Sequence, residues 1–104
     1  MPERDSAELV AENAYVLDLV QAMLGAISPD MRAVSVEVTE RGVRLHFRLA
    51  GEDARDREAI EDIVFEFEAL MMQGAEVEVS AVVSSERMAA CEVPGRRVFG
   101  RRED

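Results

Sequence analysis

The residues able to do acid–base or nucleophilic chemistry are few in this sequence. It has one histidine, His46, and one cysteine, Cys91. His46 alternates with Arg44 and Arg48, so in an extended strand it lies between two cations on one polar face. Nucleophilic catalysis needs a nucleophile, a base and a group that orients the base, and spacing assigns no serine or cysteine to His46. The pattern favours an exposed surface histidine, with a pH-sensing or contact role as the alternative.

The cysteine, histidine, acidic and glycine residues form no pattern that is typical of a metal site or a cofactor site. A zinc site needs three or four cysteine, histidine or carboxylate ligands, and the spacing of a calcium loop is absent. Five of the six glycines fall at or near predicted element ends, which leaves no phosphate-binding loop. With 22 acidic residues, pairs of carboxylates arise by chance. We therefore predict a protein that is not an enzyme.

The size and the net charge of the chain limit the classes of partner that it can bind. A chain of 104 residues fits a single domain, residues 1–104. Its net charge of −10 repels phosphate backbones and anionic membranes, so we expect no direct binding to nucleic acid and none to membranes. No apolar stretch is long enough to span a bilayer, and no secretory signal is recognisable. A lone thiol fits a reducing compartment, which predicts a soluble protein of the cytoplasm.

The first predicted element is a helix that begins at Asp5 or Ser6 and ends before Pro29. Apolar residues recur along it at spacings of three and four, which predicts one core-facing stripe. They are Leu9, Val16, Leu17, Val20, Met23, Leu24 and Ile27. Asn13 falls inside this stripe, so we expect it to bond a neighbouring loop. Tyr15 projects off the stripe, either as a partly covered residue at the edge of the core or as a contact residue.

Two half-buried strands follow, joined by a turn at residues 40–42. Their apolar residues alternate with polar ones. These are Val34, Val36 and Val38 in the first strand, and Val43, Leu45, Phe47 and Leu49 in the second. Pairing Val38 with Val43 keeps all of them on one face and places Glu37 opposite Arg44. The register of this hairpin is therefore predicted from the sequence.

A second helix over residues 53–73 and a strand over residues 76–83 come next, and a short fourth strand is placed at residues 97–99. The buried stripe of the helix has the usual helical spacing. It consists of Ile60, Ile63, Val64, Phe67, Leu70 and Met71. A short helical turn is placed at residues 85–91. The predicted fold class is α+β, in the order α-β-β-α-β(-β), with a mostly antiparallel sheet and two helices packed on one face. The third strand can pair with either hairpin strand.

The outer face of the second helix is unusual for an isolated domain. On a helical wheel, Phe65 and Met72 project opposite the buried stripe, among carboxylates. An apolar anchor with a charged rim is typical of a protein–protein contact. The predicted partner-binding residues are Glu58, Glu61, Asp62, Phe65, Glu68, Met72 and Tyr15. The alternative is a solvated acidic face on which the C-terminal segment covers only Phe65 and Met72. A homodimer through the same residues is another alternative.

Three segments carry a family resemblance: residues 27–36 after an amphipathic helix, residues 56–63 in the acidic helix, and residues 98–103 near the end. Together with the hairpin, they resemble the small acidic bacterial immunity proteins of contact-dependent and polymorphic toxin systems. The resemblance implies a cytoplasmic protein that binds and neutralises a cognate toxin, often a nuclease, by blocking its active site or substrate route. It assigns no role to a particular residue. The alternative is a homo-oligomeric structural or adaptor domain without catalytic activity.

Overall fold

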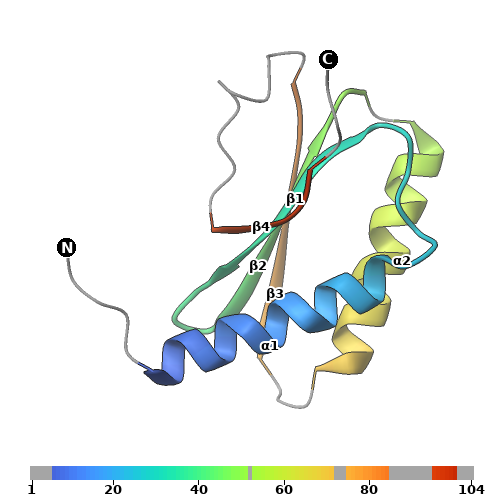
Figure 1. The fold of residues 1–104 in the computed structure, drawn as a ribbon. Helices are drawn as coiled ribbons and strands as arrows, with labels where there is room; N and C mark the ends of the chain where they lie inside the picture. Colours follow the sequence, from blue (N-terminus) through green and yellow to red (C-terminus); the bar gives the residue numbers. More distant parts are fainter. Residues whose placement is uncertain (1–5, 52, 72–74, 85–94, 101–104) are drawn as a thin grey trace.

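The computed structural model describes residues 6–51, 53–71, 75–84 and 95–100. It contains helices and strands in the predicted α+β arrangement (Figure 1). In chain order they are α1 (Ser6–Met23), β1 (Met31–Val38), β2 (Gly42–Leu49), α2 (Ala54–Leu70), β3 (Glu76–Val83) and β4 (Arg96–Gly100). Neither helix is long and apolar enough, over the part described, to cross a membrane.

The four strands form one sheet in the order β3-β2-β1-β4. β1 pairs antiparallel with both β2 and β4, whereas β3 pairs parallel with β2. The parallel pair follows from the connection, because α2 carries the chain back along the sheet before β3 begins. The choice that the sequence left open is thereby settled, with β3 at the edge beside β2.

The predicted register of the hairpin is confirmed. The paired residues are Val38 with Val43, Glu37 with Arg44, Val36 with Leu45, and Val34 with Phe47. The cross-strand pair carries a charge interaction, with 3.6 Å between Arg44 Nη1 and Glu37 Oε1. Because a shift of one residue would turn the apolar side chains toward solvent, burial of these valines fixes the pairing.

Both helices pack on the same face of the sheet, as predicted. The core joins residues of α1, α2 and the alternate positions of β1 and β2. Its buried members are Leu19, Ala22, Met23, Met31, Val34, Val36, Val43, Leu45, Phe47, Leu49, Ile60, Ile63 and Phe67. The valines of the edge strand β3 are less covered, with Val79 and Val83 exposed by 44% and 49%.

The predicted core stripe of α1 is largely wrong. Leu17 and Leu24 are exposed by 69% and 68%, and Leu9, Val20 and Ile27 by 38%, 43% and 45%. Leu19, which the stripe omitted, is completely buried. The physical reason is that α1 carries apolar residues around most of its circumference, so spacing alone does not select the side that faces the sheet.

β4 is attached to α1 through Arg96. Its Nη1 donates a hydrogen bond to Asn13 Oδ1 over 2.7 Å and lies 3.6 Å from Glu12 Oε1. Asn13 is therefore an exposed residue bonded to a strand, where the sequence predicted a buried one bonded to a loop. Glu12 is buried on the sheet side of α1, so the arginine supplies the opposite charge that a buried carboxylate requires.

Candidate partner-binding face

The start of α2 is fixed by a reciprocal capping box. Asp53 Oδ1 accepts hydrogen bonds from the backbone N–H of Arg55 and Asp56, over 2.8 and 3.1 Å. In return the Asp53 N–H donates to Asp56 Oδ2 over 2.9 Å. Three backbone N–H groups at the helix start, those of Asp53, Arg55 and Asp56, are thereby satisfied. The cap sets where the helix begins and so which side chains point outward along it.

The outer side of α2 carries Phe65, whose exposed fraction of 72% is the highest given for a large apolar residue in the described part. The four predicted acids beside it are also exposed. We call this surface the α2 face, which consists of Glu58, Glu61, Asp62, Phe65 and Glu68. The structure thus brings together five of the seven residues predicted for partner binding. Met72 lies outside the described residues.

Tyr15, the seventh, does not lie on the α2 face. Its ring packs against Phe67 with centroids 6.1 Å apart at an interplanar angle of 41°, between the two helices. The half-buried side chain also lines a hollow of about 410 Å³ next to Ala11, Ala75 and the β1–β2 turn. Tyr15 therefore helps to join α1 to α2, which is the partly covered position that the sequence allowed.

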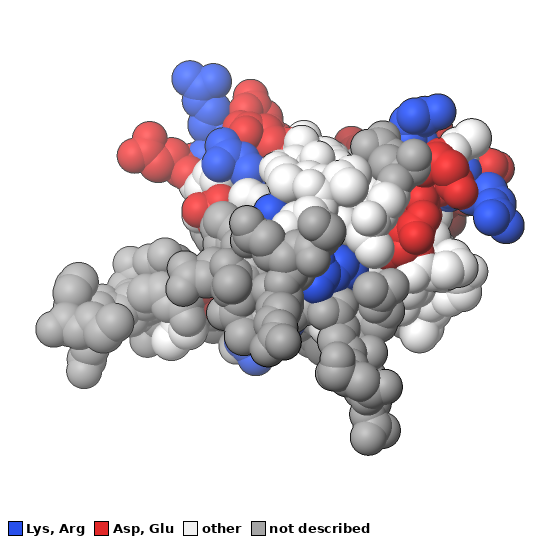
Figure 2. Space-filling model, turned by 90° about the horizontal axis from the view of Figure 1, so that it is seen from above, with Lys and Arg blue, Asp and Glu red and all other residues white. Residues whose placement is uncertain are grey.

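Charge on the surface is uneven. Figure 2 shows acidic side chains next to arginines in two groups, with uncharged surface between them. On α2, Arg55 and Arg57 are confined to the first turns, whereas the exposed acids continue to Glu68. The negative potential is therefore concentrated along the later turns of the helix, around Phe65.

The polar face of the sheet, on the side away from the helices, contains His46. The histidine Nε2 lies 2.9 Å from Glu37 Oε1, and only 12% of the side chain is exposed. The prediction of an exposed histidine is therefore wrong, because this neighbour and the surrounding chain cover it. Arg44 extends the row, since its Nε and Nη2 donate to Glu78 Oε2 over 3.0 and 2.7 Å. These side chains tie β1, β2 and β3 together, which is a structural role.

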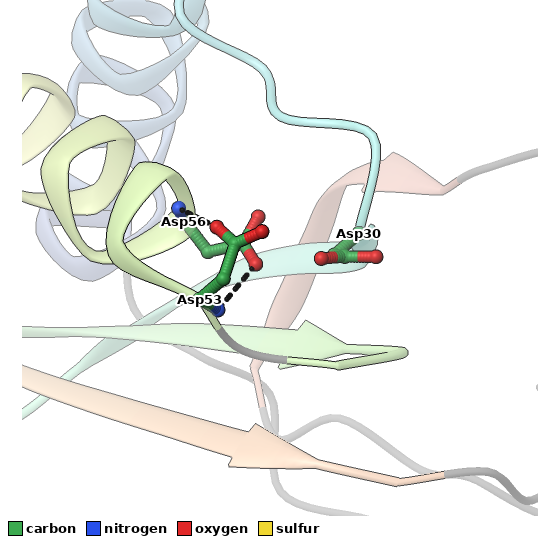
Figure 3. A group of neighbouring side chains, drawn as sticks. All are labelled: Asp30, Asp53 and Asp56. Carbon is green, nitrogen blue, oxygen red and sulfur yellow. Dashed lines mark hydrogen bonds between the residues drawn. The ribbon is translucent and has the colours of Figure 1, made fainter.

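A carboxylate cluster lies where α2 begins. Figure 3 shows Asp53 and Asp56 joined by the hydrogen bonds of the capping box, with Asp30 nearby on the turn that leads into β1. Oxygen atoms of the three side chains lie within 4.8 Å of one another. Oxygen ligands of this kind suit calcium or magnesium. The cap already accounts for the proximity of Asp53 and Asp56.

Asp56 is the member of this cluster with a shifted pKa. Burial alone would raise it, since only 1% of the residue is exposed. The influence of the Ser28 hydroxyl, of Asp30 and of the Asp53 N–H outweighs burial and holds the pKa of Asp56 below its ordinary value. Ser28 Oγ is itself buried and makes no hydrogen bond of normal geometry. The ionised carboxylate of Asp56 is therefore part of the folded structure.

Sequence reasoning missed this carboxylate and the buried Glu12. The spacing of Asp53 and Asp56 carried a signal for the first, because it is the spacing of a capping box. No local sequence pattern predicts the burial of Glu12, because its partner Arg96 is distant in sequence.

A comparison with known families gives the family of this chain. The family model of the MafI2 immunity proteins matches residues 12–103, which is nearly the whole chain. This chain belongs to the MafI2 immunity protein family. The resemblance to small immunity proteins of polymorphic toxin systems is thereby confirmed. No curated protein matches the sequence.

Because this chain belongs to an immunity protein family, its general role is to neutralise a toxin. Such a role requires a contact surface and no reacting groups, and it agrees with the prediction of a protein without catalytic activity. An exposed phenylalanine ringed by acids does nothing for the core, but it suits recognition of another protein.

Proposed function

We propose that this chain binds a cognate protein toxin in the cytoplasm through the α2 face and neutralises it by covering its active site or substrate route. The observation that carries the proposal is Phe65, exposed by 72% and flanked by Glu58, Glu61, Asp62 and Glu68. The whole chain acts as one domain, with no catalysis of its own and no cofactor.

The arrangement of the α2 face supports this role on energetic grounds. An aromatic side chain that becomes fully desolvated in a partner's pocket contributes much of the binding free energy of an interface. The surrounding carboxylates add steering toward a basic surface and discriminate against acidic ones. A nuclease toxin presents such a basic surface, because it must itself bind nucleic acid. We therefore take a nuclease as the preferred class of partner.

Co-expression with the toxin encoded beside the gene tests the proposal. The wild-type chain should restore growth, and Phe65→Glu should abolish protection while the protein remains folded and present at normal levels. Leu17→Glu is the matched control, since Leu17 is equally exposed but lies on α1. Loss of protection by the α1 substitution, with Phe65→Glu still protective, would refute the assignment to α2.

A further inference from the structure

We propose that the exposed side of α1 is a docking surface for a second copy of this chain, formed by antiparallel pairing of the two α1 helices. The surface consists of Val10, Ala14, Leu17, Val20 and Leu24, which we call the α1 stripe. Val10, Leu17 and Leu24 are exposed by 67%, 69% and 68%. At 100° per residue Leu17 points nearly opposite the buried Leu19, so packing among the residues that the structure describes does not account for the stripe.

The α1 stripe has no charge, in a chain whose net charge is −10. The outer positions of α1 are 10, 13, 14, 17, 20 and 21, and Leu24 and Ile27 continue this side just after the helix. None of these residues is acidic or basic. Their only polar members are Asn13 and Gln21. Two strongly acidic molecules repel each other over most of their surfaces, and here they can approach without opposing acids. The charged group at the edge of this surface is basic, since Arg96 is bonded to Asn13.

A hollow of about 370 Å³ extends the stripe toward β4. Val20, Leu24 and Ile27 line it from the α1 side, and Val98 and Phe99 from β4. The apolar surface is therefore wider than one helix and has a concave part that can receive side chains.

The spacing of the residues in the α1 stripe favours a second copy of this chain as the binding partner. From Val10 to Leu24 the steps are four, three, three and four residues, which is symmetric about Leu17. A two-fold axis at Leu17 therefore places Val10 opposite Leu24 of the second copy and the small Ala14 opposite Val20. Steps of three and four residues keep side chains on one side of a helix, which helices that pack side by side require. A surface that is complementary to itself is the requirement for a two-fold dimer.

The polar neighbours are compatible with the same axis. It places Asn13 opposite Gln21 of the second copy, and Asp18 opposite Val16. No acid on α1 faces an acid of the other copy. A toxin needs no such symmetry, and an uncharged stripe would give it little basis for discrimination, so the second copy is the better match.

The area is sufficient for a reversible dimer. The exposed apolar area of Val10, Leu17, Val20, Leu24 and Ile27 is about 500 Å² per copy. A two-fold pair would therefore bury about 1,000 Å² in total, which is near the lower limit for a specific interface. We therefore expect a weak dimer that dissociates reversibly on dilution. The α2 face lies on the other helix, so the dimer would present two toxin-binding faces, and the inference does not depend on the proposed function.

Sedimentation velocity on the purified chain over a wide concentration range tests the dimer. The wild-type chain should be a reversible dimer. Leu17→Glu should raise the dissociation constant at least tenfold with unchanged circular dichroism, because it opposes two charges across the axis. Phe65→Glu, of matched exposure, should leave the dimer intact. A wild-type chain that stays monomeric, or a dimer lost only with Phe65→Glu, would overturn the proposal.

Cross-linking tests the antiparallel geometry without relying on a destabilising charge. In a Cys91→Ser background, Leu17→Cys should cross-link to itself with a short bis-thiol reagent. Val10→Cys should not, because antiparallel pairing separates the two copies of residue 10 by about 21 Å along the helices. Efficient cross-linking of Val10→Cys, or none with Leu17→Cys, would contradict the pairing.

Discussion

Phe65 and Phe67 lie two residues apart on α2 and point in opposite directions. Phe67 is completely buried and packs against Tyr15, whereas Phe65 is exposed by 72%. Two residues on a helix are separated by about 200°, so one turn of α2 serves both the core and the surface. The helix is therefore anchored by Phe67 while it presents Phe65 to a partner.

The two phenylalanines should differ sharply in their contribution to stability. Phe67→Ala should lower the free energy of unfolding by about 3–5 kcal/mol, because it leaves a cavity between the helices. Phe65→Ala should change it by about 0.5 kcal/mol or less, since the side chain is already in water. Urea denaturation of both variants makes the comparison. Equal losses would mean that Phe65 is covered in the folded chain.

Because of Asp56, the free energy of unfolding should depend on pH in the acid range. Its pKa is lower in the folded chain than its ordinary value of about 3.9, so the stability that it contributes is present above that value. That stability is lost as the pH falls through the folded pKa. At neutral pH, Asp56→Ala should cost about 1–2 kcal/mol through loss of the capping box.

Denaturation of wild type and Asp56→Ala between neutral and strongly acid pH checks this dependence. The difference between the two proteins should shrink on acidification. Asp62→Ala removes an exposed carboxylate from the same helix and serves as the control, with little effect at any pH. A gap between wild type and Asp56→Ala that widens in acid would contradict the direction of the shift.

Gly42 should be intolerant of a side chain. A Cβ there would overlap the backbone N and O of Glu76, where β3 starts beside β2. We expect Gly42→Ala to cost about 2 kcal/mol or more, because the two backbones must separate. Gly51→Ala is the control, since a Cβ there would have its nearest neighbour, a carboxylate oxygen of Asp30, at 3.9 Å. Thermal unfolding of the two variants should separate them clearly, and equal melting temperatures would exclude a tight approach at Gly42.

The sequence predicted those parts of the fold in which one face is apolar and the other is polar. The hairpin register from Val34 to Phe47 and the buried side of α2 belong to this class, because a wrong register or rotation would expose many apolar groups at once. The outward position of Phe65 followed from the same helical geometry.

The parts that escaped prediction depend on contacts between distant segments. α1 has apolar residues on both sides, so spacing did not reveal that Leu19 faces the sheet and Leu17 does not. The contact of His46 with Glu37 depends on side chains of two neighbouring strands, and the pairing of Glu12 with Arg96 depends on how α1 meets β4. The spacing of residues along one element encodes neither contact. At the candidate site, helical geometry predicted that five residues share one exposed side of α2. It grouped Tyr15 with them only because Tyr15 projects off the predicted stripe of α1.

The acids of the α2 face should act mainly on the rate of association with the toxin. Glu61→Gln should slow association and reduce its dependence on salt, because the carboxylate steers a basic partner before contact. Glu40→Gln, an equal change of charge on the β1–β2 turn, is the control. Stopped-flow kinetics at low and high salt measure the effect. An unchanged association rate for Glu61→Gln, or an equal effect of Glu40→Gln, would place the steering surface elsewhere.

The most direct test of the account is a calorimetric titration of the chain with the toxin encoded beside it. Wild type should bind tightly, and Phe65→Glu should weaken binding at least a hundredfold, because it places a charge where the aromatic anchor is desolvated. Leu17→Glu, which changes an equally exposed residue on α1, should bind as wild type does. Wild-type affinity for Phe65→Glu, or no binding by the wild-type chain, would contradict the claim that α2 carries the recognition of the toxin.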